Sequence, residues 1–136
     1  MTDTYRPTTL TARSVRNLLG VHPDLCKVIE AAVVVMPLDG GVSFIVTEGL
    51  RTHKRQAQLV ASGASKTMNS RHLTGHAVDV AAMLGGVVRW DWPLYNRLAQ
   101  VFKNKANVLG IHIVWGGDWR EFKDGPHFEL SREWYK

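Results

Sequence analysis

The 136-residue sequence has little cysteine and no long apolar run. Its single cysteine, Cys26, cannot form a disulfide within the chain, and it falls in an apolar helical pattern that is typical of a packed side chain. The longest apolar stretch, residues 31–37, is too short to cross a bilayer. The first ten residues, MTDTYRPTTL, lack the basic-then-apolar order of a secretory signal. These absences predict a soluble protein that is made in the cytoplasm and forms no stable membrane association.

Acidic residues are also scarce relative to basic ones. The net charge of +5 and the pI near 9.7 favour an anionic partner such as nucleic acid, anionic lipid or a cell-wall polymer. No Asp or Glu interrupts the five basic residues between positions 51 and 71, which are Arg51, Lys54, Arg55, Lys66 and Arg71. The run predicts a local positive field, although a solvated face on a basic protein would look the same.

Length and periodicity indicate one domain spanning residues 1–136, since no repeat, linker or low-complexity tract divides the chain. Apolar spacing and the placement of Gly and Pro predict helices over 14–20, 23–36, 53–62 and 92–109, and strands over 42–49, 76–84, 87–90, 111–115 and 127–130. Ser14 and Thr52 are the expected caps of the first and third helices. The fold class is therefore α+β, with a small, mostly antiparallel sheet packed with helices.

Three of the six histidines have ordinary structural explanations. His22 stands at the start of a helix, and His53 lies on an expected exposed helix. His112 lies in an apolar strand, where a hydrogen-bonded core histidine is the simplest expectation. These three are not assigned to a site.

His72, Asp79 and His127 are more informative because their settings complement one another. Asp79 alternates with apolar neighbours in a strand and therefore points away from them, His72 precedes that strand across the flexible Gly75, and His127 opens a second strand. Two imidazoles and one carboxylate match a catalytic zinc that keeps a fourth position for water. Spacing alone is weak evidence, since His and Asp also recur in loops as caps and turn residues.

Two further residues fit the same chemistry. Asp124, three positions before His127, is a carboxylate that could accept a proton from an attacking water. Its alternative is an ordinary Asp-Gly-Pro turn. Arg51, which follows a strand, could stabilise the negative oxygen of an attacked amide, and its alternative is a surface arginine at a helix start.

Three separated blocks together resemble a known family. The first is Gly49, Arg51, Thr52 and Gln56; the second is Ser70, His72, Gly75, Ala77 and Asp79; the third reads WGGDW and then DGPHFEL. The pattern is similar to that of zinc D-alanyl-D-alanine carboxypeptidases and dipeptidases, which share their fold with the Hedgehog signalling domain. It is most similar to the small phage endolysins that are L-alanyl-D-glutamate peptidases, and it spans about residues 14–130.

The resemblance implies a role for each matching residue. His72, Asp79 and His127 would bind one Zn²⁺, Asp124 would be the general base, and Arg51 would polarise the scissile carbonyl. Ser70 and Gln56 would be substrate contacts. Carboxypeptidase relatives usually have Glu at the position of Asp124, whereas the endolysin branch has Asp, as this chain does. His76 occupies a variable place in the pattern, and Trp115 and Trp119 are expected to wall the cleft and brace the ligands.

The first functional hypothesis is therefore a phage-type endolysin, a bacteriolytic zinc metallopeptidase that hydrolyses the L-alanyl-D-glutamate bond of peptidoglycan stem peptides. We expect a monomer that needs a holin-type membrane lesion to reach the periplasmic wall and that binds no nucleic acid. A D-alanyl-D-alanine carboxypeptidase with the same metal site is the alternative. More distant alternatives are a basic nucleic-acid-binding protein, for which no motif is present, and a Hedgehog-like protein that has lost catalysis.

Overall fold

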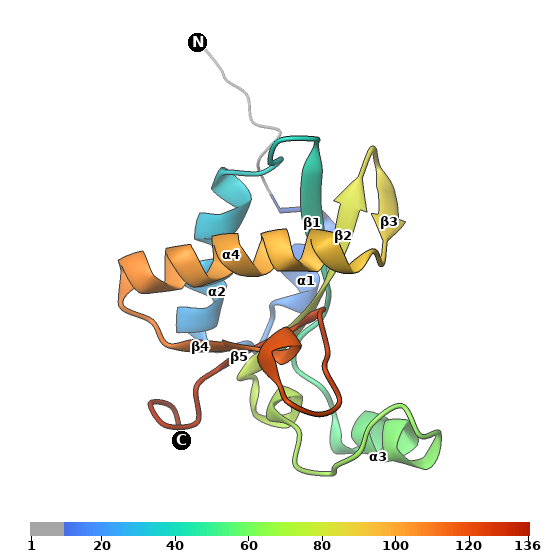
Figure 1. Ribbon diagram of the computed structural model, residues 1–136. Helices are drawn as coiled ribbons and strands as arrows, with labels where there is room; N and C mark the ends of the chain where they lie inside the picture. The colour runs from blue at the N-terminus through green and yellow to red at the C-terminus, as the bar shows by residue number, and fades with distance from the viewer. Residues whose placement is uncertain (1–9) are drawn as a thin grey trace.

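A computed structural model describes residues 10–136, so nearly all of the N-terminal stretch considered above, residues 1–9, lies outside the described part (Figure 1). The helices are α1 (Ala12–Asn17), α2 (Pro23–Val34), α3 (His53–Ala61) and α4 (Trp92–Leu109), with short 3-10 helices η1 (Arg71–Thr74) and η2 (Gly116–Asp118). The strands are β1 (Val42–Glu48), β2 (Ala77–Leu84), β3 (Val87–Arg89), β4 (Ile113–Trp115) and β5 (His127–Leu130).

The strands form one antiparallel sheet in the order β1-β2-β5-β4, and β3 pairs with the far end of β2. Alternating residues of these strands, among them Val46, Val78, Val80 and Phe128, are buried on one face. Helices α2 and α4 pack with these residues into a continuous hydrophobic core. The α+β class with a small antiparallel sheet is thereby confirmed.

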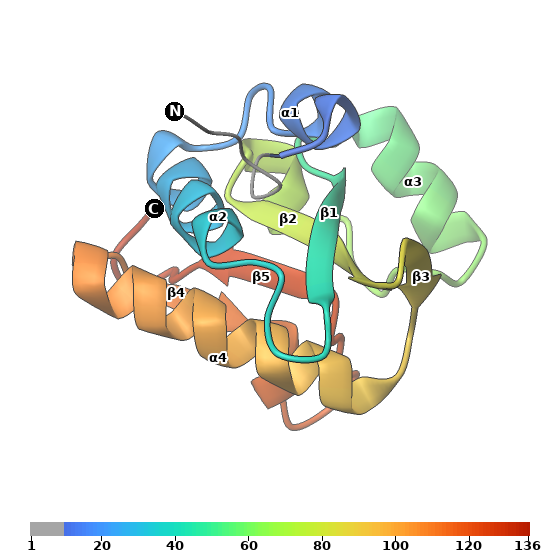
Figure 2. The same cartoon turned by 90° about the horizontal axis from the view of Figure 1, so that it is seen from above.

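Helix α3 lies apart from this core. It lies on the opposite side of the molecule from α4 in Figure 2, and below the rest of the molecule in Figure 1. Thr52 caps α3 as expected, its hydroxyl accepting a hydrogen bond from the Arg55 amide. Gln56 is the only residue of α3 that is buried, so this helix contributes little to the core.

Strand register places three polar side chains in one row across the sheet. Asp79 of β2 pairs with His127 of β5 on one side and with Glu48 of β1 on the other. A register irregularity between Val46 and Glu48 precedes the second pairing. Directly paired residues on neighbouring strands point to the same face. The row therefore lies on the face opposite Val78 and Val80, at one end of β2.

Some details differ from the sequence-based predictions. Thr11, not Ser14, caps α1, because Ser14 is fully buried and its hydroxyl instead accepts a hydrogen bond from the Val46 amide. His112 is exposed rather than in the core, and its ring stacks on Trp134. At the end of α4, Val108 and Leu109 are 73% and 44% exposed, so the last turn of that helix contributes little to the core.

The loop before β2 contains the 3-10 helix η1, which the sequence did not predict. Ser70 caps it, and it ends at Gly75 with a φ of +76°. A side chain at position 75 would be strained at this φ, and its Cβ would lie 2.3 Å from the carbonyl oxygen of Gly20. Gly75 therefore permits the tight reversal that carries the chain from His72 back into β2. Among the described residues, no helix has the length and apolar character needed to cross a membrane.

Candidate metal centre and active site

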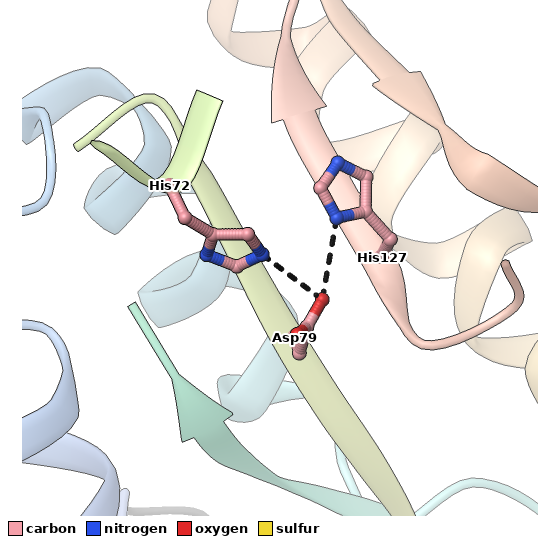
Figure 3. Close-up of side chains that lie close together, drawn as sticks. All are labelled: His72, Asp79 and His127. Atoms are coloured by element: carbon pink, nitrogen blue, oxygen red, sulfur yellow. Dashed lines mark hydrogen bonds and ion pairs between the residues drawn. The ribbon is translucent and has the colours of Figure 1, made fainter. Parts of the chain in front are cut away.

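The structure brings His72, Asp79 and His127 together, although they come from η1, β2 and β5 (Figure 3). Oδ1 of Asp79 lies 3.3 Å from Nε2 of His72 and 3.2 Å from Nδ1 of His127. One ligand atom from each residue lies within 4.8 Å of the other two. These three side chains could hold a metal ion.

His72 is oriented by the backbone around it. Its Nδ1 lies 2.8 Å from the carbonyl oxygen of Gly49, and a carbonyl can only accept, so Nδ1 carries the proton. In the neutral ring Nε2 then has a free lone pair directed at Asp79. Gly49 is required here because a Cβ at this position would lie 2.0 Å from the Asn17 carbonyl oxygen. The Ser70 hydroxyl accepts a hydrogen bond from the His72 amide, which fixes the start of η1.

His127 is oriented by a carboxylate that the sequence analysis did not single out. Nε2 of His127 lies 2.8 Å from Oε1 of Glu129, which is 7% exposed. The two residues are two positions apart in β5 and so share a face. This contact places the proton on Nε2 and turns Nδ1 toward Asp79, an arrangement common for metal-ligating histidines.

Burial and mutual contacts shift the pKa values of His127 and Asp79 in this cluster. Burial lowers the pKa of His127, but its hydrogen bonds with Asp79 and Glu129 outweigh burial and raise that pKa to about 9. Burial raises the pKa of Asp79, but the neighbouring rings of His127 and His72 outweigh burial and hold that pKa well below its usual range. The cluster therefore favours a negative Asp79 facing a positive charge.

The donor set fits zinc. When His127 is deprotonated, Nε2 of His72, Nδ1 of His127 and an oxygen of Asp79 are three acceptors that face one point, and they can share that point only around a cation. Ligands about 2.0 to 2.1 Å from a tetrahedral zinc are roughly 3.3 Å apart. The separations from Asp79 in the structure, 3.3 Å to Nε2 of His72 and 3.2 Å to Nδ1 of His127, agree with that value.

Asp124 lies on the turn that leads into β5 and faces the same pocket. Its amide donates to the Gly116 carbonyl, and its own carbonyl accepts from the His127 amide. The buried Trp115 indole donates to the Gly125 carbonyl at 2.7 Å, which braces the turn. Burial, followed by the charge of Asp79, raises the pKa of Asp124. A raised pKa suits a group that must take up and return a proton.

Arg51 follows β1, the strand that pairs with β2 at Asp79, and is 8% exposed. Its Nη2 is 3.6 Å from Oδ2 of Asp79. Glu48 accepts from Nε at 3.0 Å and from Nη2 at 2.7 Å, and Oε1 of Gln56 accepts from Nη1 at 2.7 Å. A guanidinium has five N–H donors, so these contacts leave two for a substrate. Glu48 was not foreseen as a partner of Arg51.

The two expected substrate contacts, Gln56 and Ser70, and one cation of the basic run, Arg71, all have hydrogen-bond partners within the protein. Gln56 is fully buried, and its amide nitrogen donates to Ser65 and Thr67. These bonds fix the amide whose oxygen accepts from Arg51. Arg71 is 8% exposed and donates to the carbonyls of Leu130 and Tyr135. It is therefore not a free cation for ligands. Ser70 does line the pocket, although its hydroxyl is engaged by the His72 amide.

The pocket has a volume of about 830 Å³ and is lined by Arg51, His72, Asp79, Asp124 and His127. Such a volume accommodates several amino-acid residues of a peptide. Trp119 forms part of the wall, with its ring 5.0 Å from that of His127, as expected. Trp115 is buried behind the turn and acts as a brace rather than as wall.

The sequence and the fold of this chain are shared with known proteins. The family model "Phage L-alanyl-D-glutamate peptidase" matches residues 7–132. The chain belongs to this family, and the resemblance noted in the sequence is confirmed.

Individual relatives carry the same description. The chain is 32% identical to the L-alanyl-D-glutamate peptidase of Escherichia phage T5, with 90% of this chain and 88% of that protein covered. It is 41% identical over 96 residues to the L-alanyl-D-glutamate peptidase of Listeria phage A118, of which it spans only 33%. The crystal structure of the Serratia marcescens L-Ala D-Glu endopeptidase ChiX superposes with a TM-score of 0.84 at 50% identity, covering 93% of this chain and 92% of that one.

Proposed function

We propose that this chain is a zinc-dependent peptidase, acting as a single domain over residues 1–136, that hydrolyses the L-alanyl-D-glutamate bond of peptidoglycan stem peptides. The observation that carries the proposal is the convergence of His72, Asp79 and His127 on one point of a peptide-sized pocket. The relatives described above carry this activity in their names. Family membership favours this function over nucleic-acid binding.

In the proposed mechanism, Nε2 of His72, Nδ1 of His127 and a carboxylate oxygen of Asp79 would hold the ion. Bound zinc would supply Lewis acidity, which lowers the pKa of a water toward about 7 and polarises a carbonyl. Asp124 takes the proton of the attacking water and returns it to the leaving amine. Arg51 uses its remaining N–H groups to stabilise the oxygen of the attacked carbonyl.

The supporting residues keep this geometry. The Gly49 carbonyl and Glu129 fix the tautomers of the two histidines, so that each offers a lone pair to the ion. Glu48 and Gln56 hold the guanidinium of Arg51 beside Asp79. Ser70 is proposed to contact substrate from the pocket wall, while Gln56 is proposed to act through Arg51.

The proposal extends to the setting in which the enzyme acts. We propose a monomeric endolysin that reaches the peptidoglycan after the membrane has been permeabilised by a holin-type partner. The basic character of the chain, with a net charge of +5, favours its attraction to an anionic wall.

Product analysis tests the proposed bond specificity. Purified peptidoglycan is digested with the zinc-loaded protein, and the new termini are identified by mass spectrometry. New amino-terminal glutamate with carboxy-terminal alanine supports the L-alanyl-D-glutamate cut. Release of free alanine from the stem end would instead show a D-alanyl-D-alanine carboxypeptidase. A content of about one zinc per chain, whichever product forms, would show that the pocket walls and not the metal select the bond that is cut.

A further inference from the structure

Two loops from different parts of the chain meet at the rim of the pocket. Lys66 follows α3, and Phe122 lies between η2 and β5. The Lys66 ammonium lies 5.5 Å from the centroid of the Phe122 ring, and both residues line the pocket that contains the metal triad. We call this pair the rim clamp.

Lys66 differs from the other cations of this pocket. Arg51 is held by Glu48, Arg71 by two backbone carbonyls, and Arg132 lies 3.8 Å from Glu129. Within residues 10–136, Lys66 forms no ion pair with a carboxylate. It is exposed, and its ammonium contacts only a ring face that carries no net charge. Its charge is therefore available to an anionic ligand.

Phe122 lies in a conformation that does not serve the stability of the fold. Its φ is +53°, in the left-handed region that costs a bulky residue about 1 to 2 kcal/mol, and its side chain is 71% exposed. An exposed aromatic gains little from burial to offset that strain. Strain of this kind at a pocket rim is typical of a residue retained for binding.

We propose that the rim clamp is the site that recognises the free carboxylate of the glutamyl residue in the substrate, and that Lys66 is its specificity-determining residue. The inference rests on the proposed function. A glutamyl residue has two carboxyl groups, and only one of them can carry the next residue of a linear peptide. The other stays anionic close to the scissile amide, in the same pocket as Lys66.

The clamp geometry explains why lysine suits this position. An ammonium is a compact charge with three N–H donors, and the Phe122 ring engages only one side of it. The ring restricts the otherwise flexible side chain, which reduces the entropy lost when a carboxylate binds. A hydrogen bond between charged groups in such a site corresponds to on the order of tenfold in kcat/KM.

Two matched peptides test this inference on the zinc-loaded protein. Both contain an L-alanyl-D-glutamyl bond, and they differ only in whether the free carboxylate of the glutamyl residue is kept or converted to a carboxamide. The native protein should cleave the carboxylate peptide with a kcat/KM on the order of tenfold higher. Lys66→Met should reduce this ratio to within about twofold by lowering kcat/KM for the carboxylate peptide alone. Phe122→Leu should reduce it partly.

Two control variants separate the clamp from general charge and folding effects. Lys54→Met removes a similar exposed lysine that does not line the pocket, and it should leave the ratio unchanged. Lys66→Arg keeps the charge and should keep most of the preference. Retention of the full ratio in Lys66→Met would overturn the inference.

The native protein also distinguishes the two proposals. Equal cleavage of both peptides would overturn the clamp while leaving the proposed peptidase function intact. Failure to cleave either peptide between alanine and glutamate would overturn the proposed function, and the clamp with it.

Discussion

The sheet end and the pocket rim are built in contrasting ways. At the sheet end, Glu48, Asp79 and His127 occupy paired positions on three neighbouring strands, and every polar atom that orients them has a partner. At the rim, Lys66 and Phe122 lie on exposed loops, and the Lys66 ammonium lies over the Phe122 ring. The proposed metal ligation therefore rests mainly on strands of fixed register, and the proposed recognition rests on loops.

This difference has a physical reason. Metal ligation tolerates misplacements of only a fraction of an ångström, which strands with fixed register can guarantee. Choosing a substrate requires only that charge be available at the right distance, which a loop residue can provide. Changes at the sheet end should therefore abolish activity or metal binding, whereas changes at the rim should alter only substrate preference.

The largest effect is expected for Asp124→Ala. Removal of the general base should lower kcat by about 10³-fold while about one zinc per chain remains bound. Metal analysis and turnover measured on the same preparation check both parts. Asp118→Ala is the matched control, since Asp118 is an exposed carboxylate of η2 that pairs with Lys103. Loss of zinc from Asp124→Ala would instead identify Asp124 as a ligand.

A smaller effect is expected for Glu129→Gln. The amide keeps the size of the side chain but removes the negative charge that orients and polarises His127. Zinc affinity should fall about 10- to 100-fold, measured by competition with a chromophoric chelator. Glu133→Gln, which neutralises an exposed carboxylate lining the same pocket, should bind zinc normally. Equal affinities for both variants would contradict the orienting role of Glu129.

Much of this site could be predicted from the sequence because its signals are local. The alternation around Asp79 indicated which face of the strand it uses, and Gly125-Pro126 indicated that His127 opens a strand and not a helix. Gly75 indicated the reversal between His72 and Asp79. Convergence on one ion was then the simplest interpretation, and the structure places the three side chains together. Zinc binding itself stays a prediction.

Most of the supporting contacts could not be predicted, because the partners are distant in the sequence or depend on strand register. The pairing of Glu48 with Asp79 depends on an irregularity in β1 that the sequence does not reveal. Arg71 looked like a free cation, but carbonyls near the far end of the chain accept its hydrogen bonds. Glu129 was visible in principle, since a residue two positions after His127 shares its face. That spacing could have identified it.

Zinc uptake should depend on pH because protons compete for His127. Without metal, its pKa of about 9 means that the ring is protonated at pH 7, whereas ligation needs the lone pair of Nδ1. Binding at pH 7 should therefore release about one proton from His127, and the apparent affinity should rise about tenfold per pH unit up to about pH 9.

Calorimetry at pH 7 in buffers of different ionisation enthalpy measures the released protons. In Glu129→Gln one of the two carboxylates that raise the pKa of His127 is lost, so fewer protons should be released. An affinity that is constant from pH 7 to 9 would show that His127 is already neutral in the metal-free protein.

The smallest effect is expected for Phe122→Gly. Glycine relieves about 1 to 2 kcal/mol of left-handed strain, but it loses about 0.5 to 1 kcal/mol to the entropy of the unfolded chain and a similar amount from the exposed contact with Lys66. These contributions nearly cancel, so the free energy of unfolding should change by less than about 1 kcal/mol. Phe128→Ala, which empties a fully buried position of β5, should cost about 3 to 5 kcal/mol. Denaturant titration of both variants measures their free energies of unfolding. A decrease of more than about 2 kcal/mol for Phe122→Gly would mean that the rim, like the sheet end, is held by packing.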